Sequence, residues 1–188
     1  MPQIVQIILT IVVFLIIAGA TVFLITSVIS LLLNVPYVGT SSRELEVIFG
    51  SLSLKNKSTF YDLGSGDGRV VRYVAKRFSL ISVGVEANPL LYLYSIFLNL
   101  IFHSQYVHYK LARAENISFE SADVIYMFLF PKLLNLLSSK IKKECKPGTI
   151  IVAHGFKVSG FDEFLYNTMP GKPFNTYYYR LNTPQDDV

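Results

Sequence analysis

Phe60-Tyr61-Asp62-Leu63-Gly64-Ser65-Gly66-Asp67-Gly68 is the stretch that decides the fold of this 188-residue chain. Its first residues are mostly apolar and predict a buried strand, and its second half is a glycine-rich turn. Residues 69–78 follow at once and carry apolar side chains at helical spacing. A strand that leads through glycines into a helix is typical of an open α/β sheet, in which ligands bind at the carboxyl ends of the strands.

Strands and helices alternate on both sides of this stretch. The pattern predicts strands at 59–63, 81–86, 107–111, 123–130, 149–154 and 176–181, and helices at 43–51, 69–78, 88–103 and 132–144. Alternation of this kind implies a Rossmann-like, doubly wound α/β fold whose mostly parallel sheet is covered by helices on both faces.

The spacing of the glycines separates two classes of cofactor that use such a loop. Dinucleotides need Gly-x-Gly-x-x-Gly, with a pyrophosphate at the helix N-terminus, whereas here the third glycine comes one residue early. The carboxylate of Asp62 would repel a pyrophosphate but suits a ligand with an amino group and a sulfonium. The loop therefore predicts S-adenosylmethionine as the cofactor. The residues expected to contact it are Asp62, Gly64, Ser65, Gly66, Asp67 and Gly68.

Two polar residues close the next predicted strand. Glu86 lies 22 positions after Gly64, and a carboxylate at that site can accept hydrogen bonds from both ribose hydroxyls. The alternative is that Glu86 is an ordinary exposed acid at a strand end, but its spacing from the glycine loop favours the ribose contact. Asn88 either contacts the adenosine or caps the following helix, and the sequence leaves both interpretations open.

The N-terminal part of the chain has a different composition. No Lys, Arg, Asp or Glu occurs from Met1 to Ser42, and residues 4–33 are almost wholly apolar. This run exceeds the roughly 20 residues that a bilayer core needs. A cleaved signal peptide would show a basic start and a shorter apolar core. We therefore expect one uncleaved transmembrane anchor at 1–34, followed by a catalytic domain at 35–188.

The charges predict where the second domain lies. All 17 Lys and Arg residues follow the anchor, so the positive-inside rule places the domain on the cytoplasmic, or matrix-equivalent, side of the membrane. A second apolar run, residues 90–102, is too short for another span, and we expect a buried or membrane-surface helix there. No basic run and no Cys/His cluster indicates nucleic acid or a metal ion, and the single Cys145 cannot form an internal disulfide.

Taken together, these motifs resemble the class I, seven-strand methyltransferases. More narrowly, the chain resembles the membrane-anchored protein-lysine methyltransferases of the adenine nucleotide translocase and the ATP synthase c-subunit, with their prokaryotic relatives. The apolar anchor carries the resemblance, together with residues 35–40, 62–71 and 84–89. It implies an N-methyltransferase whose partners are the bilayer and a membrane protein that presents a lysine. A lipid or small-molecule methyltransferase and a non-catalytic cofactor-binding protein are the rival interpretations; the intact loop and Glu86 argue against the last.

The resemblance also assigns residues outside the glycine loop. Tyr37 is expected to close over the methionine end of the cofactor or to touch the substrate, and Thr40 to contact the cofactor. Phe130 and Pro131 are expected to line the path to the methyl group, with an aromatic wall and a backbone carbonyl that faces the amine. A plain strand-to-helix turn explains Phe130 and Pro131 equally well.

Three further expectations concern the C-terminal half. The family usually has an Asp near the adenine after the third strand; here Arg113 takes that position, so Glu115 or backbone groups are expected to contact the adenine instead. His154 ends the fifth predicted strand and is expected to be structural rather than a proton carrier. The chain after residue 154 is short, so the antiparallel hairpin that ends the family's sheet is expected to be incomplete.

Overall fold

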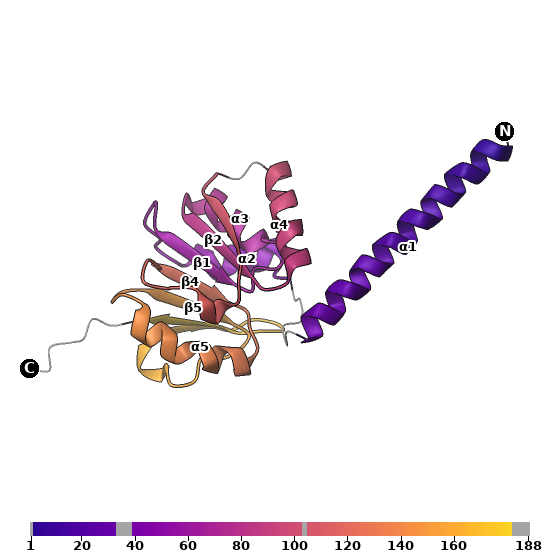
Figure 1. Cartoon of the computed structure of the whole chain (residues 1–188). Helices are drawn as coiled ribbons and strands as arrows, with labels where there is room; N and C mark the ends of the chain where they lie inside the picture. The colour runs from indigo at the N-terminus through magenta and orange to yellow at the C-terminus, as the bar shows by residue number, and fades with distance from the viewer. Residues whose placement is uncertain (1, 33–38, 103–104, 182–188) are drawn as a thin grey trace, which may run out of the picture. The chain divides into compact units, whose positions relative to one another are not determined.

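The computed structural model describes residues 2–32, 39–102 and 105–181. The chain divides into two compact units, Met1–Pro36 and Tyr37–Val188. The described part of the first unit is one helix, α1 (Pro2–Leu32), drawn in indigo in Figure 1. Its segment Gln3–Ile25 has a mean hydropathy of 3.0 and is long and apolar enough to cross a membrane. Tyr37 lies outside the described residues.

A seven-stranded sheet organises the second unit, with the strand order β3-β2-β1-β4-β5-β7-β6. Strands β1 to β5 pair in parallel, while β7 runs antiparallel to both β5 and β6. The strands are β1 (Thr59–Leu63), β2 (Ile81–Glu86), β3 (Val107–Leu111), β4 (Val124–Met127), β5 (Ile150–His154), β6 (Leu165–Met169) and β7 (Thr176–Arg180). This is the doubly wound, mostly parallel sheet expected from the sequence.

Helices cover both faces of the sheet (Figure 1). They are α2 (Ser42–Gly50), α3 (Arg69–Phe78), α4 (Pro89–Phe102) and α5 (Pro131–Glu144), and the short 3₁₀ helices are η1 (Ala114–Asn116) and η2 (Asp162–Phe164). The connections β1–α3–β2 and β2–α4–β3 advance towards one edge of the sheet, whereas β4–α5–β5 advances towards the other. Since such crossovers are right-handed, α5 lies on the face opposite to α3 and α4.

The largest core cluster joins α2 and α3 to one face of the sheet. It contains Leu45, Ile48, Phe49, Phe60, Val70, Val74, Leu80, Val124, Tyr126, Val152 and Tyr178. Side chains alternate along a strand, so Phe60 and Asp62 of β1 point to this face, as do Val124 and Tyr126 of β4. Asp62 and Tyr126 are direct partners in the β1–β4 register. The polar ends of these two strands therefore meet above the apolar core.

The structure confirms several predicted elements to the residue, namely β1, β2, β3 and α3. The strand predicted at 123–130 ends earlier, at Met127, because the chain leaves the sheet there to start α5 with Phe130 as its N-cap. The expectation of an incomplete hairpin is wrong, since β6 pairs with β7. The middle residues of β6 are exposed, so this edge strand lacks the apolar alternation by which strands are predicted.

Candidate functional site

The loop between β1 and α3 adopts a backbone that only glycine accepts easily. Gly64, Gly66 and Gly68 have φ values of +80°, +55° and +74°. A Cβ atom on Gly64 would lie 2.9 Å from the Leu129 side chain, and one on Gly68 would overlap the Tyr109 ring. The N–H groups of Gly64 and Ser65 donate to the Val85 carbonyl at 2.8 and 3.0 Å, which fixes the loop against β2. The loop thus presents bare backbone at the carboxyl edge of the sheet.

Two buried polar side chains, Asp62 and Ser65, mark what we call the inner side of this loop, and each has an unpaired atom. Asp62 is only 2% exposed, and its Oδ2 atom has no hydrogen-bond partner among the described residues; the same holds for the Ser65 hydroxyl. Burial, together with the nearby carboxylates of Glu86 and Asp67, raises the pKa of Asp62 well above its usual range. A buried carboxylate without a donor is costly. The site therefore fits a ligand that brings a cationic donor, such as the amino group of S-adenosylmethionine.

Glu86 is buried at the end of β2 and holds the loop from the side. Its two carboxylate oxygens accept hydrogen bonds from the Gly66 and Asn88 N–H groups, each at 2.8 Å. Burial raises the pKa of Glu86, and these backbone donors partly oppose that effect. The Ala87 N–H is a third backbone donor to this carboxylate, which with about four acceptor positions keeps capacity to accept from a ligand hydroxyl. Asn88 caps α4 through its Oδ1 atom, 3.0 Å from the Leu90 nitrogen.

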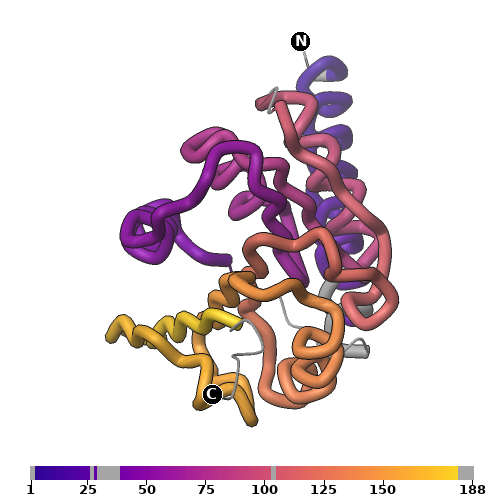
Figure 2. The backbone as a smooth tube through the Cα atoms, turned by 90° about the vertical axis from the view of Figure 1, so that its left-hand side faces the viewer, coloured from indigo at the N-terminus to yellow at the C-terminus, as the bar shows by residue number. Residues whose placement is uncertain are grey.

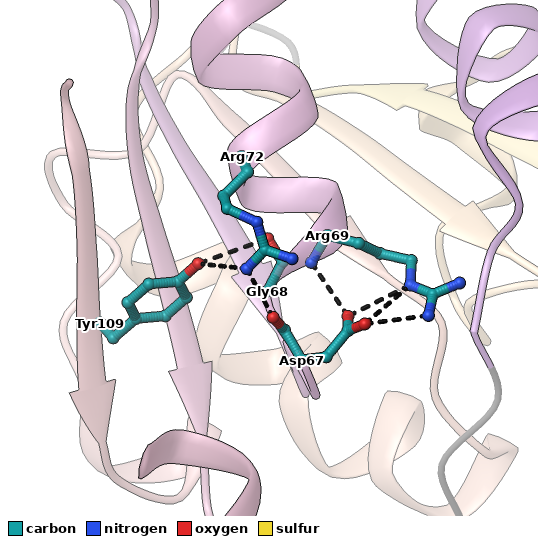
Figure 3. Close-up of polar contacts among 5 residues, drawn as sticks. All are labelled: Asp67, Gly68, Arg69, Arg72 and Tyr109. Atoms are coloured by element: carbon teal, nitrogen blue, oxygen red, sulfur yellow. Dashed lines mark hydrogen bonds and ion pairs between the residues drawn. The ribbon is translucent and has the colours of Figure 1, made fainter. Parts of the chain in front are cut away.

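The outer side of the loop is occupied by a charged network (Figure 3). The Asp67 carboxylate accepts from the Arg69 backbone at 3.0 Å and forms an ion pair with its guanidinium at 2.9 Å. Arg72 donates to the Asp67 carbonyl at 2.6 Å and to the Tyr109 hydroxyl at 3.2 Å, and that hydroxyl donates to the Gly68 carbonyl. The carboxylate of Asp67 is thus paired with Arg69 of α3, and mainly the backbone of Asp67 is left to face a cofactor.

The sequence did not single out Arg72 or Tyr109. Arg72 follows Arg69 by one helical turn, which was a usable signal. Tyr109 depends on the pairing of β2 with β3, in which it stands opposite Gly84. A Cβ on Gly84 would come within 2.8 Å of both the Tyr109 ring and the Ser65 hydroxyl. The missing side chain at Gly84 therefore makes room for both groups beneath the loop.

Thr40 reaches the same edge of the sheet from the segment before α2. It is buried, and its hydroxyl lies 3.0 Å from the Tyr126 hydroxyl on β4. Burial raises the pKa of Tyr126, so this phenol stays neutral. Tyr126 neighbours Asp62 across the strand pair. The sequence singled out Thr40 but not Tyr126, whose position on the same strand face as Val124 was the available clue.

Phe130 and Pro131 form the turn from β4 into α5. Phe130 is 44% exposed, and its ring lies 6.1 Å from the Phe156 ring, centroid to centroid. Its carbonyl accepts from the Leu133 and Leu134 nitrogens at 3.0 and 3.1 Å. The Phe130 carbonyl is therefore used by the first turn of α5, and a backbone carbonyl of this turn that faces the amine stays a prediction. The aromatic ring remains available as a wall.

The segment after β3 carries the residues expected near the adenine. The Ala112 N–H donates to the Glu86 carbonyl at 3.0 Å, which brings this segment alongside the end of β2. Arg113 and Glu115 form an ion pair at 2.6 Å. Burial alone would raise the pKa of Glu115, but its own backbone N–H and Arg113 outweigh burial and lower it. Glu115 is thus ionised and paired with a cation, three residues after the contact of Ala112 with Glu86.

His154, at the end of β5, belongs to a buried cluster. Its Nδ1 atom lies 2.9 Å from the Thr176 hydroxyl, and the Phe128 ring packs edge-on against it at 4.6 Å. Burial lowers the pKa of His154 and keeps the ring neutral. A cavity of about 240 Å³ opens beside it, between the start of α2 and the β6–β7 turn. Charged residues of both signs, Arg43, Glu44 and Lys172, are among its lining residues.

The fold and the loop together define a class of protein, the class I S-adenosylmethionine-dependent methyltransferases. The solved RNA methyltransferase from Salinibacter ruber, in complex with S-adenosyl-L-homocysteine, superposes with a TM-score of 0.74. It covers 80% of this chain and 98% of its own at 21% identity, which is evidence of a common fold. The profile of the ANTKMT methyltransferase domain matches residues 62–163. The chain belongs to this family.

Two curated relatives are similar over most of the domain. The protein-lysine N-methyltransferase of Saccharolobus islandicus is 29% identical over 146 residues, which are 69% of this chain and 81% of that enzyme. The adenine nucleotide translocase lysine N-methyltransferase of Mus musculus is 33% identical over 129 residues. That match covers 68% of this chain and 56% of the mouse protein. The chain thus spans little more than half the length of its mouse relative.

Proposed function

We propose that this methyltransferase is a membrane-anchored protein-lysine N-methyltransferase that acts on a membrane protein. The buried carboxylate of Asp62 beside the glycine loop, whose Oδ2 atom has no partner among the described residues, carries the catalytic part of the proposal. The lysine acceptor is supported by relatives that are named as lysine methyltransferases. The membrane is supported by the length and hydropathy of the segment Gln3–Ile25.

The proposed cofactor contacts follow from the geometry of the loop. Asp62 accepts from the amino group of the cofactor, and Glu86 accepts from the ribose hydroxyls. The backbone of residues 64–68 and the Ser65 hydroxyl line the methionine end. Thr40 supports this end through Tyr126, and Asn88 supports Glu86 from the start of α4. Glu115 lies on the segment beside Glu86 and is the proposed adenine contact.

The acceptor side is proposed to lie at the turn after β4. When bound, the cofactor supplies an electrophilic methyl group on its sulfonium. The chain must therefore orient a lysine amine and favour its neutral form. The exposed ring of Phe130, with Pro131, offers an apolar wall, and an apolar wall lowers the pKa of an amine by disfavouring its charged form. Leu129 already reaches the glycine loop at Gly64, so this wall adjoins the proposed cofactor site. Tyr37 is proposed to close the site from the anchor side.

A methylation assay tests the reaction itself. The full chain, reconstituted in lipid nanodiscs with candidate membrane proteins, is incubated with S-adenosylmethionine labelled in the methyl group. We expect label in protein, on lysine side chains identified by mass spectrometry, and no label with the Asp62→Asn variant. Label found only in the lipid extract would show a lipid methyltransferase instead.

Anchoring is tested separately. We propose that residues 1–34 cross the bilayer once and that residues 35–188 form the catalytic domain on the cytoplasmic or matrix-equivalent side, because every Lys and Arg follows α1. Alkaline carbonate extraction should leave the protein in the membrane fraction. In sealed vesicles, protease should cleave the domain only when it is added on the cytoplasmic or matrix-equivalent side. Release of the intact chain by carbonate would refute the anchor while leaving the methylation result unaffected.

A further inference from the structure

Helix α4 carries an apolar stripe on the side that faces away from the sheet. Its members are Leu93, Tyr94, Phe97, Leu100 and Ile101, each between 49% and 68% exposed. Successive residues of a helix turn by about 100°, which places these five side chains within an arc of about 120°. Ser95, the one fully buried residue of α4, lies on the opposite side. The stripe is thus an outer surface and does not belong to the core.

The other helices that cover the sheet show a different outer surface. The outer side of α3 bears Arg69, Lys76 and Arg77, and that of α5 bears several lysines around the exposed Leu136. Five large apolar side chains, each open over about half its area, form a patch of the size, a few hundred Å², that marks interaction sites on soluble proteins. The exposed Tyr106 and Leu111, near the far end of α4 and on the neighbouring strand, add to it.

The charges around the stripe indicate what covers it. No Asp or Glu occurs between Ala87 and Ala114; Lys110 lies within that segment, and Arg113, also within it, is paired with Glu115. An apolar helix face without acids suits the surface of a bilayer. Tyr94 and Tyr106 present a ring with a hydroxyl, the side-chain type enriched where a bilayer meets water.

The chain itself brings a bilayer within reach if α1 spans it. Seven peptide steps separate Leu32, the end of α1, from Gly39. At about 3.3–3.6 Å per step, the two residues lie at most about 25 Å apart. A second contact with the same bilayer therefore needs no added partner and is favoured by the high effective concentration that such a tether creates.

We propose that the outer stripe of α4 docks into the headgroup region of the bilayer that α1 crosses. The proposal rests on the anchoring proposed above and adds a second attachment point. Helix α4 starts directly after Glu86 and Asn88, at the carboxyl edge of the sheet. Docking of α4 therefore fixes how this edge, with the proposed cofactor site, is oriented to the membrane. A site held this way meets lysines that lie close to the bilayer surface.

Spin-label accessibility in the full chain tests the proposal. Cys145, the single cysteine, is replaced by Ser, and one nitroxide is attached after Phe97→Cys, Leu100→Cys, Leu136→Cys or Phe14→Cys. Leu136 on α5 is 58% exposed and matches the exposure of Phe97, at 56%, so it serves as the control, and Phe14 reports on α1. Each protein is placed in nanodiscs of phosphatidylcholine and phosphatidylglycerol, and cofactor binding verifies its fold.

The labels at 97 and 100 should be reached by oxygen, which partitions into lipid, several-fold better than by a water-soluble nickel complex. The label at 136 should show the reverse. A lipid-exposed label at 14 with water-exposed labels at 97 and 100 would overturn the docking and leave the anchor intact. Labels at 97 and 100 that neither reagent reaches would show that protein, such as a second copy, covers the stripe, which also overturns the proposal.

Discussion

The two sides of the glycine loop differ in how their polar groups are satisfied. On the outer side, hydrogen bonds of 2.6 to 3.2 Å join Asp67, Arg69, Arg72 and Tyr109, and the Tyr109 hydroxyl also donates to the Gly68 carbonyl. On the inner side, Asp62 keeps an unpaired carboxylate oxygen in a buried position. Native proteins rarely leave such groups unpaired. The outer side therefore stabilises the loop, and the inner side is the side proposed to bind the cofactor.

The largest loss of cofactor binding is expected when a side chain is placed at Gly64, on the inner side of the loop. A Gly64→Val change puts a β-branched residue at φ +80°, against the Leu129 side chain. We expect S-adenosylmethionine binding to fall below detection in calorimetry. Gly50→Ala, at a site with open space around it, is the control and should bind normally. Because Gly64→Val strains the backbone, circular dichroism must first show that the domain is folded.

Removal of the charge at Asp62 should separate binding from stability. Asp62→Asn is expected to weaken cofactor binding by about 3 kcal/mol, the upper range for a hydrogen bond to a charged group. The same change should stabilise the ligand-free protein by about 1–2 kcal/mol, because a neutral amide costs less to bury than a carboxylate. Calorimetry and thermal unfolding measure the two effects. A loss of both affinity and stability would mean that Asp62 is structural.

Substitution of Glu86 should weaken cofactor binding by an amount between those of the inner-side and outer-side substitutions. Glu86 both supports the loop and is proposed to contact the cofactor. Glu86→Ala is expected to weaken cofactor binding by about 1.5–3 kcal/mol. Glu86→Gln keeps one carbonyl acceptor for the backbone donors and should lose less. The affinity for S-adenosylmethionine compared with that for methionine shows whether the ribose is involved, since only the former should respond.

The raised pKa values of Asp62 and Glu86 predict opposite pH trends for stability and binding. A carboxyl group with a raised pKa in the folded state contributes stability below its unfolded pKa and loses it as the pH rises through the folded value. The contribution of these two groups should therefore make the ligand-free protein less stable as the pH rises. Binding of a cationic amino group needs ionised Asp62 and should strengthen. Melting temperatures with and without cofactor test both trends, and Asp62→Asn should flatten the binding trend.

The smallest effect on binding is expected on the outer side. Arg72→Met removes donors to the Asp67 carbonyl and the Tyr109 hydroxyl, which should lower the free energy of unfolding by about 1–2 kcal/mol. Cofactor affinity should change by less than about 0.5 kcal/mol, provided that the loop keeps its shape. A loss of affinity as large as that of Asp62→Asn would erase the distinction between the two sides.

The sequence alone determined the central part of the molecule. The strand, the three glycines and Glu86 predicted the sheet edge, the cofactor class and the order of the elements, because local hydrophobic spacing and glycine chemistry depend on neighbours in sequence. Helix α4 was left open between a buried and a surface position. Apart from Ser95 and Asn99, its residues are apolar or aromatic on every side, so the packing was needed to show which of them face outward.

Only the tertiary structure decided the partners of these residues. That Tyr126 lies beside Asp62 and bonds to Thr40, that Tyr109 fills the space above Gly84, and that β6 completes the sheet are results of strand register. Register depends on packing between segments far apart in the chain, which no local pattern encodes. The same packing assigned the Phe130 carbonyl to α5 and left the Asp62 Oδ2 atom without a partner among the described residues. The sequence thus predicted the cofactor loop, and the fold separated the side with an unpaired Asp62 oxygen, which is the proposed ligand-binding side, from the side whose polar groups are paired.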